Sequence, residues 1–256
     1  MATDTAFSTS SGSKRTERIR LLVQPAVVVI GVAATLLWAF SRDLDDIEKN
    51  NINAESLLTD TWDHLKVSFV VIVLVVVIAV PLGVVLTRSW AKIAAPFFLA
   101  IATIGQAAPA IGVLVLFFLW SGWEGLWAAA LPIALYSLLP VLRNTIVGLQ
   151  QVDRTLVEAA RGVGMSSPTV LFRIELPLAV PLILAGLRTS LVLAVGTATL
   201  AAFVNGGGLG LLIDAGYKLN RITILVVGAV LAMGLALLVD WLGAVAERFL
   251  RPRGLR

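Results

Sequence analysis

Long apolar runs separated by short polar segments make up most of this chain. A helix rises about 1.5 Å per residue, so roughly 20 apolar residues cross a hydrocarbon core of about 30 Å. Six runs have about this length or more, at residues 21–40, 67–87, 93–120, 126–142, 178–204 and 222–246. The second run is rich in Val and Ile, but its length favours helix over strand. The pattern predicts an all-α polytopic membrane protein with six transmembrane helices.

The third run, 93–120, is long for one straight span. Gly105, Gln106 and Pro109 interrupt it near its middle. A polar residue and a proline at membrane depth indicate either a break that faces protein or a cavity, or a kink that serves helix packing. Both interpretations fit the residues equally well.

The composition excludes several classes of function. Hydrophobic residues make up 58% of the chain and charged residues 14%, against about 25% charged residues in a soluble domain. There is no cysteine and one histidine, His64, which excludes thiolate sites, a multi-histidine metal site and a histidine relay. An intramembrane enzyme therefore lacks a catalytic set, and no metal site is expected. The basic residues lie at the ends of apolar runs, so nucleic acid is not an expected partner either.

The distribution of basic residues orients the predicted spans. With the N-terminus inside, the outer segments hold five of the 20 basic residues: Arg42, Lys49, Lys66, Lys218 and Arg221. Arg188 lies within the fifth span, and the inner segments hold the other 14: Lys14, Arg15, Arg18, Arg20, Arg88, Lys92, Arg143, Arg154, Arg161, Arg173, Arg248, Arg251, Arg253 and Arg256. Basic residues concentrate in cytoplasmic segments. We therefore expect both termini in the cytoplasm, as a tail at 1–20 and a basic tail at 249–256. Residues 41–61 are expected to form an external loop or a short surface helix.

The inner loop at 143–177 is polar and charged, unlike the segments around it. Residues 155–164 predict a short helix that ends at a glycine cap, with Leu156, Val157 and Ala160 on one small apolar face. A second short helix is expected to begin at residues 166–168, with a serine cap and an early proline. Leu176 and Pro177 then redirect the chain into the fifth span. The residues alone leave open whether this loop is a docking surface or an ordinary interfacial loop.

Polar residues within the spans are candidates for a transport pathway. Such residues face the bundle interior and either contact a substrate or bond neighbouring helices. The candidates are Gln106, Pro109, Thr197, Thr199 and Asn205. The small residues Ala194, Gly196 and Ala198 are expected to allow close helix packing. Arg188 and Asp240 are expected to play a structural role near the cytoplasmic boundary, by pairing.

The glycine segment, residues 205–210, is Asn-Gly-Gly-Gly-Leu-Gly. It has no lysine and does not match the phosphate-binding loop of ATPases, so this chain is not expected to hydrolyse ATP. The segment is predicted to be a hinge or a close-packing site.

The inner loop carries a specific resemblance. Residues 158–177 match the pattern Glu-Ala-Ala-x3-Gly-x9-Ile-x-Leu-Pro at every position. This resembles the signature loop of membrane subunits in binding-protein-dependent ABC importers. Stretches at 138–145, 184–189, 196–202 and 206–210 resemble the osmoprotectant branch of these importers, whose solutes are glycine betaine, carnitine and choline. The methionine-type permease is a close relative of that branch.

The resemblance implies a five-helix type I importer core at 62–248, with 21–40 as an additional first helix. It implies that the short helix inserts into a groove of a cytoplasmic ATPase subunit. The residues implied in ATPase coupling are Glu158, Ala159, Ala160, Arg161, Gly162, Gly164, Ile174, Leu176 and Pro177. Gly207 and Gly208 are placed near the outer gate.

The implied assembly lies in a bacterial inner membrane. Its partners are a second permease subunit, identical or different, two ATPase subunits that bind ATP and Mg, and an external solute-binding protein. This chain itself needs no cofactor. The alternatives are a permease for another small solute, such as an amino acid, and a self-sufficient secondary transporter or channel.

Overall fold

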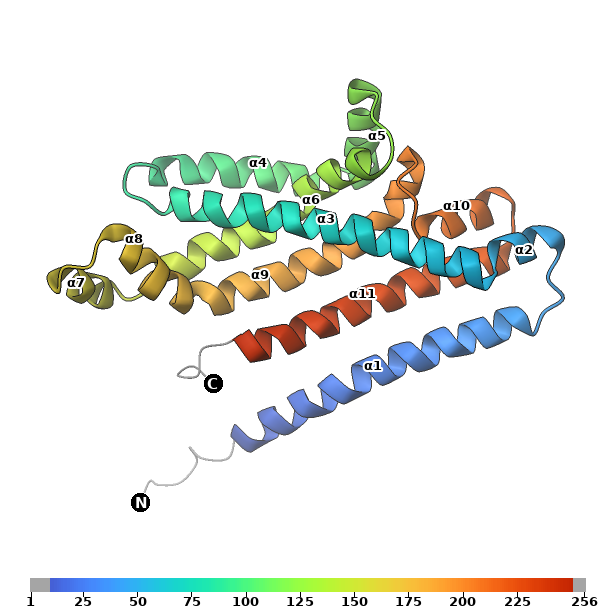
Figure 1. Cartoon of the computed structure of the whole chain (residues 1–256), viewed down its shortest axis with the longest axis horizontal. Helices are drawn as coiled ribbons and strands as arrows, with labels where there is room; N and C mark the ends of the chain where they lie inside the picture. Colours follow the sequence, from blue (N-terminus) through green and yellow to red (C-terminus); the bar gives the residue numbers. More distant parts are fainter. Residues whose placement is uncertain (1–9, 251–256) are drawn as a thin grey trace, which may run out of the picture.

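The computed structural model describes residues 10–250 and contains no strand within them. Figure 1 shows long helices running side by side, with short helices at both ends of the bundle. The α-helices are α1 Ser10–Phe40, α2 Asp46–Asn51, α3 Ala54–Leu86, α4 Ala95–Ala107, α5 Ala110–Ser121, α6 Leu126–Gln150, α7 Arg154–Gly162, α8 Ser167–Val170, α9 Leu176–Thr197, α10 Gly210–Lys218 and α11 Ile222–Leu250. Two 3₁₀ helices, η1 Lys92–Ala94 and η3 Ala198–Val204, and a π-helical stretch, η2 Leu171–Glu175, complete the described elements.

The centre of the bundle is α6, which packs against α9, α3 and α4. Small residues allow these helices to approach closely, as is usual where lipid provides no hydrophobic driving force between helices. Ala128, Ala129 and Ala130 of α6 are completely buried. A Cβ added to Gly186 of α9 would lie 2.6 Å from the carbonyl oxygen of Pro140. The outer layers follow in order, with α11 against α9 and α1 against α11.

The membrane-spanning pattern agrees with the sequence except in the third run. Five helices are long and apolar enough to cross a membrane, and α4 and α5 form a sixth span only if the bent pair is counted as one. The two helices meet at 99°, and Figure 1 shows α5 standing across the bundle direction. The interruption predicted within 93–120 is therefore confirmed, and it is a sharp break between two helices. The chain breaks at Ala108, which is extended, and at Pro109, which has no N–H to continue α4.

Two predicted boundaries fall inside helices. The boundary at 61/62 lies within α3, which begins at Ala54, and the boundary at 142/143 lies within α6, which continues to Gln150. The polar residues at these helix ends extend the backbone hydrogen-bond series beyond the apolar run. Asn53 caps α3 by accepting a hydrogen bond from the Ser56 N–H at 2.9 Å. Residues 41–61 do contain the short surface helix that was expected, α2.

The bundle has two distinct ends. The start of α1, the end of α11 and helices α7 and α8 lie together at one end, called here the α7 end (Figure 1). Helices α2 and α10 lie at the opposite end, called here the α10 end. The additional helix α1 is packed onto α11, because Val28 is buried and a Cβ on Gly234 would lie 2.9 Å from the Val32 side chain.

Candidate coupling and gating sites

Helix α7 is a capped helix whose ends are fixed by local hydrogen bonds. At its start, Asp153 Oδ1 accepts a hydrogen bond from the Thr155 N–H at 2.9 Å, and bonds to Thr155 lower the pKa of Asp153. At its end, Gly164 has φ +88°. Its N–H donates to the Arg161 carbonyl, and the Met165 N–H donates to the Ala160 carbonyl, which together form a Schellman motif. The predicted short helix with a glycine cap is confirmed.

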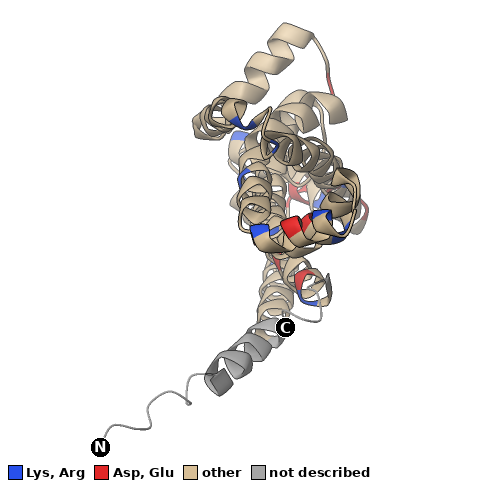
Figure 2. Ribbon diagram, turned by 90° about the vertical axis from the view of Figure 1, so that its left-hand side faces the viewer, with Lys and Arg blue, Asp and Glu red and all other residues tan. Residues whose placement is uncertain are grey.

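Little of α7 is buried against the chain. Ala160 is the one residue of this helix that is buried. The predicted apolar face is divided, because Ala160 turns inward while Leu156 remains 49% exposed. The motif residues Glu158, Ala159, Arg161, Gly162 and Gly164 are all exposed. Figure 2 views the bundle from this end and shows basic and acidic residues on the segment nearest the viewer.

The second half of the loop leads into α9 through the π-helical stretch η2. Pro168 lies in the first turn of α8, as expected, and Ser166 is at the cap position. The Ser166 hydroxyl bonds the Thr169 hydroxyl at 2.7 Å rather than a backbone N–H, so it is not a side-chain cap. Figure 1 shows a change of direction between α8 and α9, which η2 connects, close to Leu176 and Pro177, where the sequence predicts it. Ile174 lies in η2 and is partly buried.

One ion pair fixes this loop to the rest of the bundle. Arg88, just after α3, donates to Glu175 Oε2 of η2 at 2.6 Å. The pair lines a polar cavity of about 780 Å³ between the α3–α4 connection and α7, together with Lys92, Arg154, Glu158 and Arg161. The sequence did not identify this pair, because its members lie far apart in the chain.

The glycine segment at the α10 end is a close-packing site. A Cβ on Gly206 would lie 2.9 Å from the Ala201 side chain, and one on Gly210 would lie 1.8 Å from the Thr199 carbonyl oxygen. Gly207 and Gly208 have φ of +74° and +90°. Asn205 is also left-handed, with φ 58°, and its Nδ2 donates to Glu124 Oε2 at 2.9 Å. Of the two predictions for this segment, close packing is the one that the structure supports.

The other pathway candidates do not form one site in the structure. The hydroxyls of Thr197 and Thr199 donate to nearby backbone carbonyls earlier in the chain, those of Leu193 and Gly196 in α9. Gln106 is partly buried at the end of α4, and Pro109 is exposed at the break. No hydrogen bond within the described residues joins these side chains to one another.

The small residues of α9 do not all behave as predicted. Ala194 and Ala198 are completely buried, so their packing role is confirmed. Gly196 is exposed, and a Cβ there would meet nothing within 4 Å. Its predicted packing role is therefore wrong for this chain, because no helix among residues 10–250 covers the face of α9 on which Gly196 lies.

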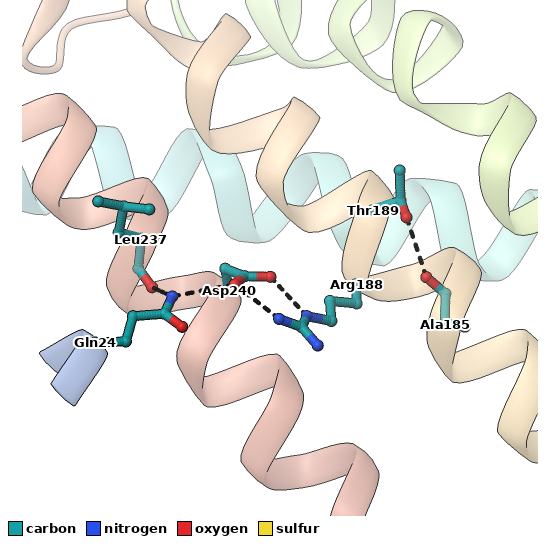
Figure 3. Close-up of polar contacts among 6 residues, drawn as sticks. All are labelled: Gln24, Ala185, Arg188, Thr189, Leu237 and Asp240. Carbon is teal, nitrogen blue, oxygen red and sulfur yellow. Dashed lines mark hydrogen bonds and ion pairs between the residues drawn. The ribbon is translucent and has the colours of Figure 1, made fainter. Parts of the chain in front are cut away.

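Figure 3 shows the predicted pairing of Arg188 and Asp240. Arg188 Nε and Nη2 donate to the two carboxylate oxygens of Asp240 at 2.6 and 2.8 Å. Gln24 of α1 adds a third bond, from Nε2 to Asp240 Oδ2 at 3.1 Å, and also donates to the Leu237 carbonyl. The ion pair borders a cavity of about 500 Å³ on the uncovered side of α9, also lined by Thr189, Val192 and Glu247.

The sequence analysis did not predict that Gln24 bonds Asp240 or that Thr189 lines the cavity beside this ion pair. A polar residue in the first apolar run was the only available signal for Gln24. Thr189 is exposed on the uncovered face of α9, although its hydroxyl also donates to its own helix, to the Ala185 carbonyl at 3.2 Å.

Comparison with known proteins decides the family. Residues 79–252 match the model of the family described as binding-protein-dependent transport system inner membrane component. This chain belongs to that family. The matched residues include both the α7 loop and the glycine segment, so the two regions described above lie in a permease subunit of an ABC transporter.

Full-length relatives of the family are similar over most of the chain. A choline transport system permease protein, OpuBB of Bacillus subtilis, is 41% identical over 204 residues, covering 80% of this chain and 93% of that protein. The osmoprotectant import permease protein OsmW of Salmonella typhimurium is 37% identical over 218 residues, covering 83% of this chain and all of that protein.

The fold has a solved counterpart. An inward-facing structure of the MetNI methionine ABC transporter matches with a TM-score of 0.65 and 25% identity. The match covers 77% of this chain and 96% of the solved chain. The predicted methionine-permease-like core is therefore confirmed, and the present chain is a type I importer permease in fold.

Proposed function

We propose that this permease subunit imports a compatible solute with a quaternary ammonium group, of the glycine betaine, choline and carnitine class. The observation that supports the proposal is the 41% identity to a choline permease over most of both chains. Several relatives are named for choline, glycine betaine or carnitine, and these solutes share a quaternary ammonium group. One observation favours an alternative, an amino acid as solute, because the matched solved transporter handles methionine.

The assembly that we propose has two permease subunits, identical or related, two ATPase subunits and a solute-binding protein. The α7 end would face the cytoplasm of a bacterial cell, with the ATPase subunits docked on α7, and the α10 end would face outward. Two features support this orientation: the excess of basic residues in the segments at the α7 end, and the exposure of the signature residues there.

The proposed mechanism uses the continuity of the chain between the two ends. ATP binding in separate ATPase subunits would bring the two α7 helices together. From α8 the chain continues through η2 into α9 without leaving a helical conformation, and α9 continues through η3 to the glycine segment. A displacement at α7 would be passed through α8 to the glycine segment along this continuous helical segment, and the two ends would open alternately.

Uptake by the reconstituted transporter tests this proposal. Proteoliposomes would contain this chain with its cognate ATPase subunit, and the cognate binding protein would be added outside. We expect ATP-dependent uptake of at least one labelled solute among glycine betaine, choline and carnitine, and none of labelled methionine. Uptake of methionine alone would support the amino-acid alternative. Uptake driven by an ion gradient without the ATPase would support a secondary transporter and contradict the proposal.

A further inference from the structure

His64 is completely buried near the α10 end of α3. From the sequence it is an isolated histidine at the edge of the second span. In the structure its Nε2 lies 2.9 Å from the carbonyl oxygen of Val195 in α9. A carbonyl oxygen only accepts hydrogen bonds, so we assign the proton of the neutral ring to Nε2. Nδ1 has no hydrogen-bond partner within the described residues.

The Val195 carbonyl is available because α9 changes its hydrogen-bonding pattern at this point. The last α-helical bond of α9 runs from the Ala198 N–H to the Ala194 carbonyl, and η3 begins at Ala198. A 3₁₀ helix bonds residues three apart, so the next carbonyl, that of Val195, loses its usual partner four residues on. His64 supplies the missing donor from a different helix.

The glycine segment closes over the same imidazole. Gly208 lies so close that a Cβ there would be 3.2 Å from both Cα and Nδ1 of His64. A Cβ on the adjacent Gly207 would be 3.2 Å from the Asp63 side chain. One side chain of α3 thus contacts both the end of α9 and the glycine segment. Within the described residues, no other side-chain hydrogen bond joins α3 to α9.

The contact of His64 with α9, η3 and the glycine segment involves no charged side chain from those elements. Residues 191–210, which form the end of α9, η3 and the glycine segment, contain no titratable side chain. The charged neighbours of His64 lie on its own helix: Asp60, Asp63 and Lys66, the last two paired at 2.9 Å. The end of α9 is therefore held by a hydrogen-bond donor at one fixed position of the imidazole ring, and a charge is not required.

We propose that His64 is a positioning residue of the gate at the α10 end. Its Nε2–H holds the Val195 carbonyl at the junction of α9 and η3, and this keeps the glycine segment closed against α3. The inference depends on the proposed function in one respect, which is that this end faces outward. In this proposal the gate opens when the end of α9 separates from α3, which breaks the His64–Val195 bond.

Two substitutions of His64 distinguish this role from simple packing. Gln can place an N–H donor near the position of Nε2, whereas Asn can place one only near Nδ1. Ser68, one turn further into the bundle, is 5% exposed and becomes the reporter as Ser68→Cys. The chain has no natural cysteine, so a membrane-impermeant maleimide can label this chain at that position only, and the labelled chain is separated from other proteins before it is quantified.

Labelling would be measured in right-side-out membrane vesicles that contain the full transporter without ATP, with the reagent added outside. We expect His64→Asn to raise the labelling rate about tenfold over the reporter alone, equivalent to about 1.4 kcal/mol, and His64→Gln to stay within about twofold. Thermal unfolding of the two variants should agree within about 3 °C, which is less than about 1 kcal/mol, so the labelling difference is not a general loss of stability.

Equal labelling of the Asn and Gln variants would overturn the inference, whether both rise or both remain low. Uptake is measured separately on the chain with natural His64. Failure of that chain to take up solute would count against the proposed function, but the ratio of labelling between the two variants does not depend on uptake.

Discussion

The two ends of this bundle use glycine for opposite purposes. At the α7 end, Gly164 has a left-handed conformation and open space around it, since a Cβ there would meet nothing within 4 Å. At the α10 end, Gly207 and Gly208 are also left-handed, but each is pressed against a side chain of α3. The glycine at the α7 end shapes the exposed end of α7, on which we propose that an ATPase subunit docks. The glycines at the α10 end allow parts of the same chain to approach one another.

This difference has a direct consequence for mutation. Substitutions at the α10 end should act first on the folded structure of the chain. Substitutions at the α7 end should leave the chain folded and should reduce the coupling of uptake to ATP hydrolysis by the partner subunits. The predictions below test that division, in order of the expected effect on unfolding.

The largest effect is expected for Gly210→Ala. The added Cβ would lie 1.8 Å from the Thr199 carbonyl oxygen, and a backbone atom cannot move aside as a flexible side chain can. We expect a loss of about 3 kcal/mol or more in the free energy of unfolding, or no folded protein. The matched control is Gly196→Ala, where the new methyl group meets nothing within 4 Å. Thermal unfolding in detergent measures both, and equal melting temperatures would contradict the close-packing interpretation.

A smaller effect is expected between the two ends, at the Arg188–Asp240 pair. Arg188→Met removes the two hydrogen bonds that the guanidinium donates to the Asp240 carboxylate. The side chains are 26% and 17% exposed, so we expect a loss of about 2 kcal/mol, below the range for fully buried pairs. The exchange Arg188→Asp with Asp240→Arg should recover part of this loss. If the double exchange is no more stable than either single change, the pair does not stabilise the bundle.

At the α7 end we expect loss of coupling with little loss of stability. Gly164→Val forces a β-branched residue into φ +88° and disrupts the end of α7, and Ala160→Trp places a large ring where 6% of the side chain is exposed. Membrane insertion should be intact, and unfolding should change by about 1 kcal/mol for Gly164→Val. ATP hydrolysis should no longer drive uptake. The control that should stay coupled is Gly122→Val, because Gly122 also has a positive φ and open space around it but lies after α5, outside the coupling residues. Full transport by Gly164→Val or Ala160→Trp would contradict the coupling role.

The smallest effect is expected from the cap of α7. The pKa of Asp153 is lowered in the folded chain, so its capping contribution is present above the usual Asp pKa near 3.8. That contribution is lost as the pH falls through the lowered folded-state pKa. Hydrogen exchange of the first α7 amides, corrected for the intrinsic rate, should show reduced protection only in that acidic window. Asp153→Asn keeps an acceptor oxygen but does not titrate, so its protection should not depend on pH there.

Much of this architecture follows from local patterns in the sequence. The apolar runs gave the long helices, and Gln106 with Pro109 located the break between α4 and α5. The spacing from Glu158 to Gly164 located α7 and its cap, because a capped helix depends on residues within a few positions of each other. These features can be predicted because each is decided by a short segment of chain.

The contacts between distant segments could not be predicted in the same way. Gly196 and Gly206 are both glycines in a small-residue region, yet one faces open space and the other meets Ala201 and Ala129. His64 and Val195 are separated by 131 residues, and the donor is useful only because α9 changes to a 3₁₀ helix beside it. Arg188 and Asp240 were expected to pair because charge inside a membrane needs a partner. No comparable rule predicts that Gln24 is the residue that donates a further hydrogen bond to Asp240.

The bond from Gln24 to Asp240 also constrains how the protein is made. The two residues are 216 positions apart, so Gln24 is synthesised long before its partner. Until α11 has been made, the Gln24 amide lacks this hydrogen bond. The bonded arrangement of α1 and α11 is therefore completed only after the chain between them has been synthesised.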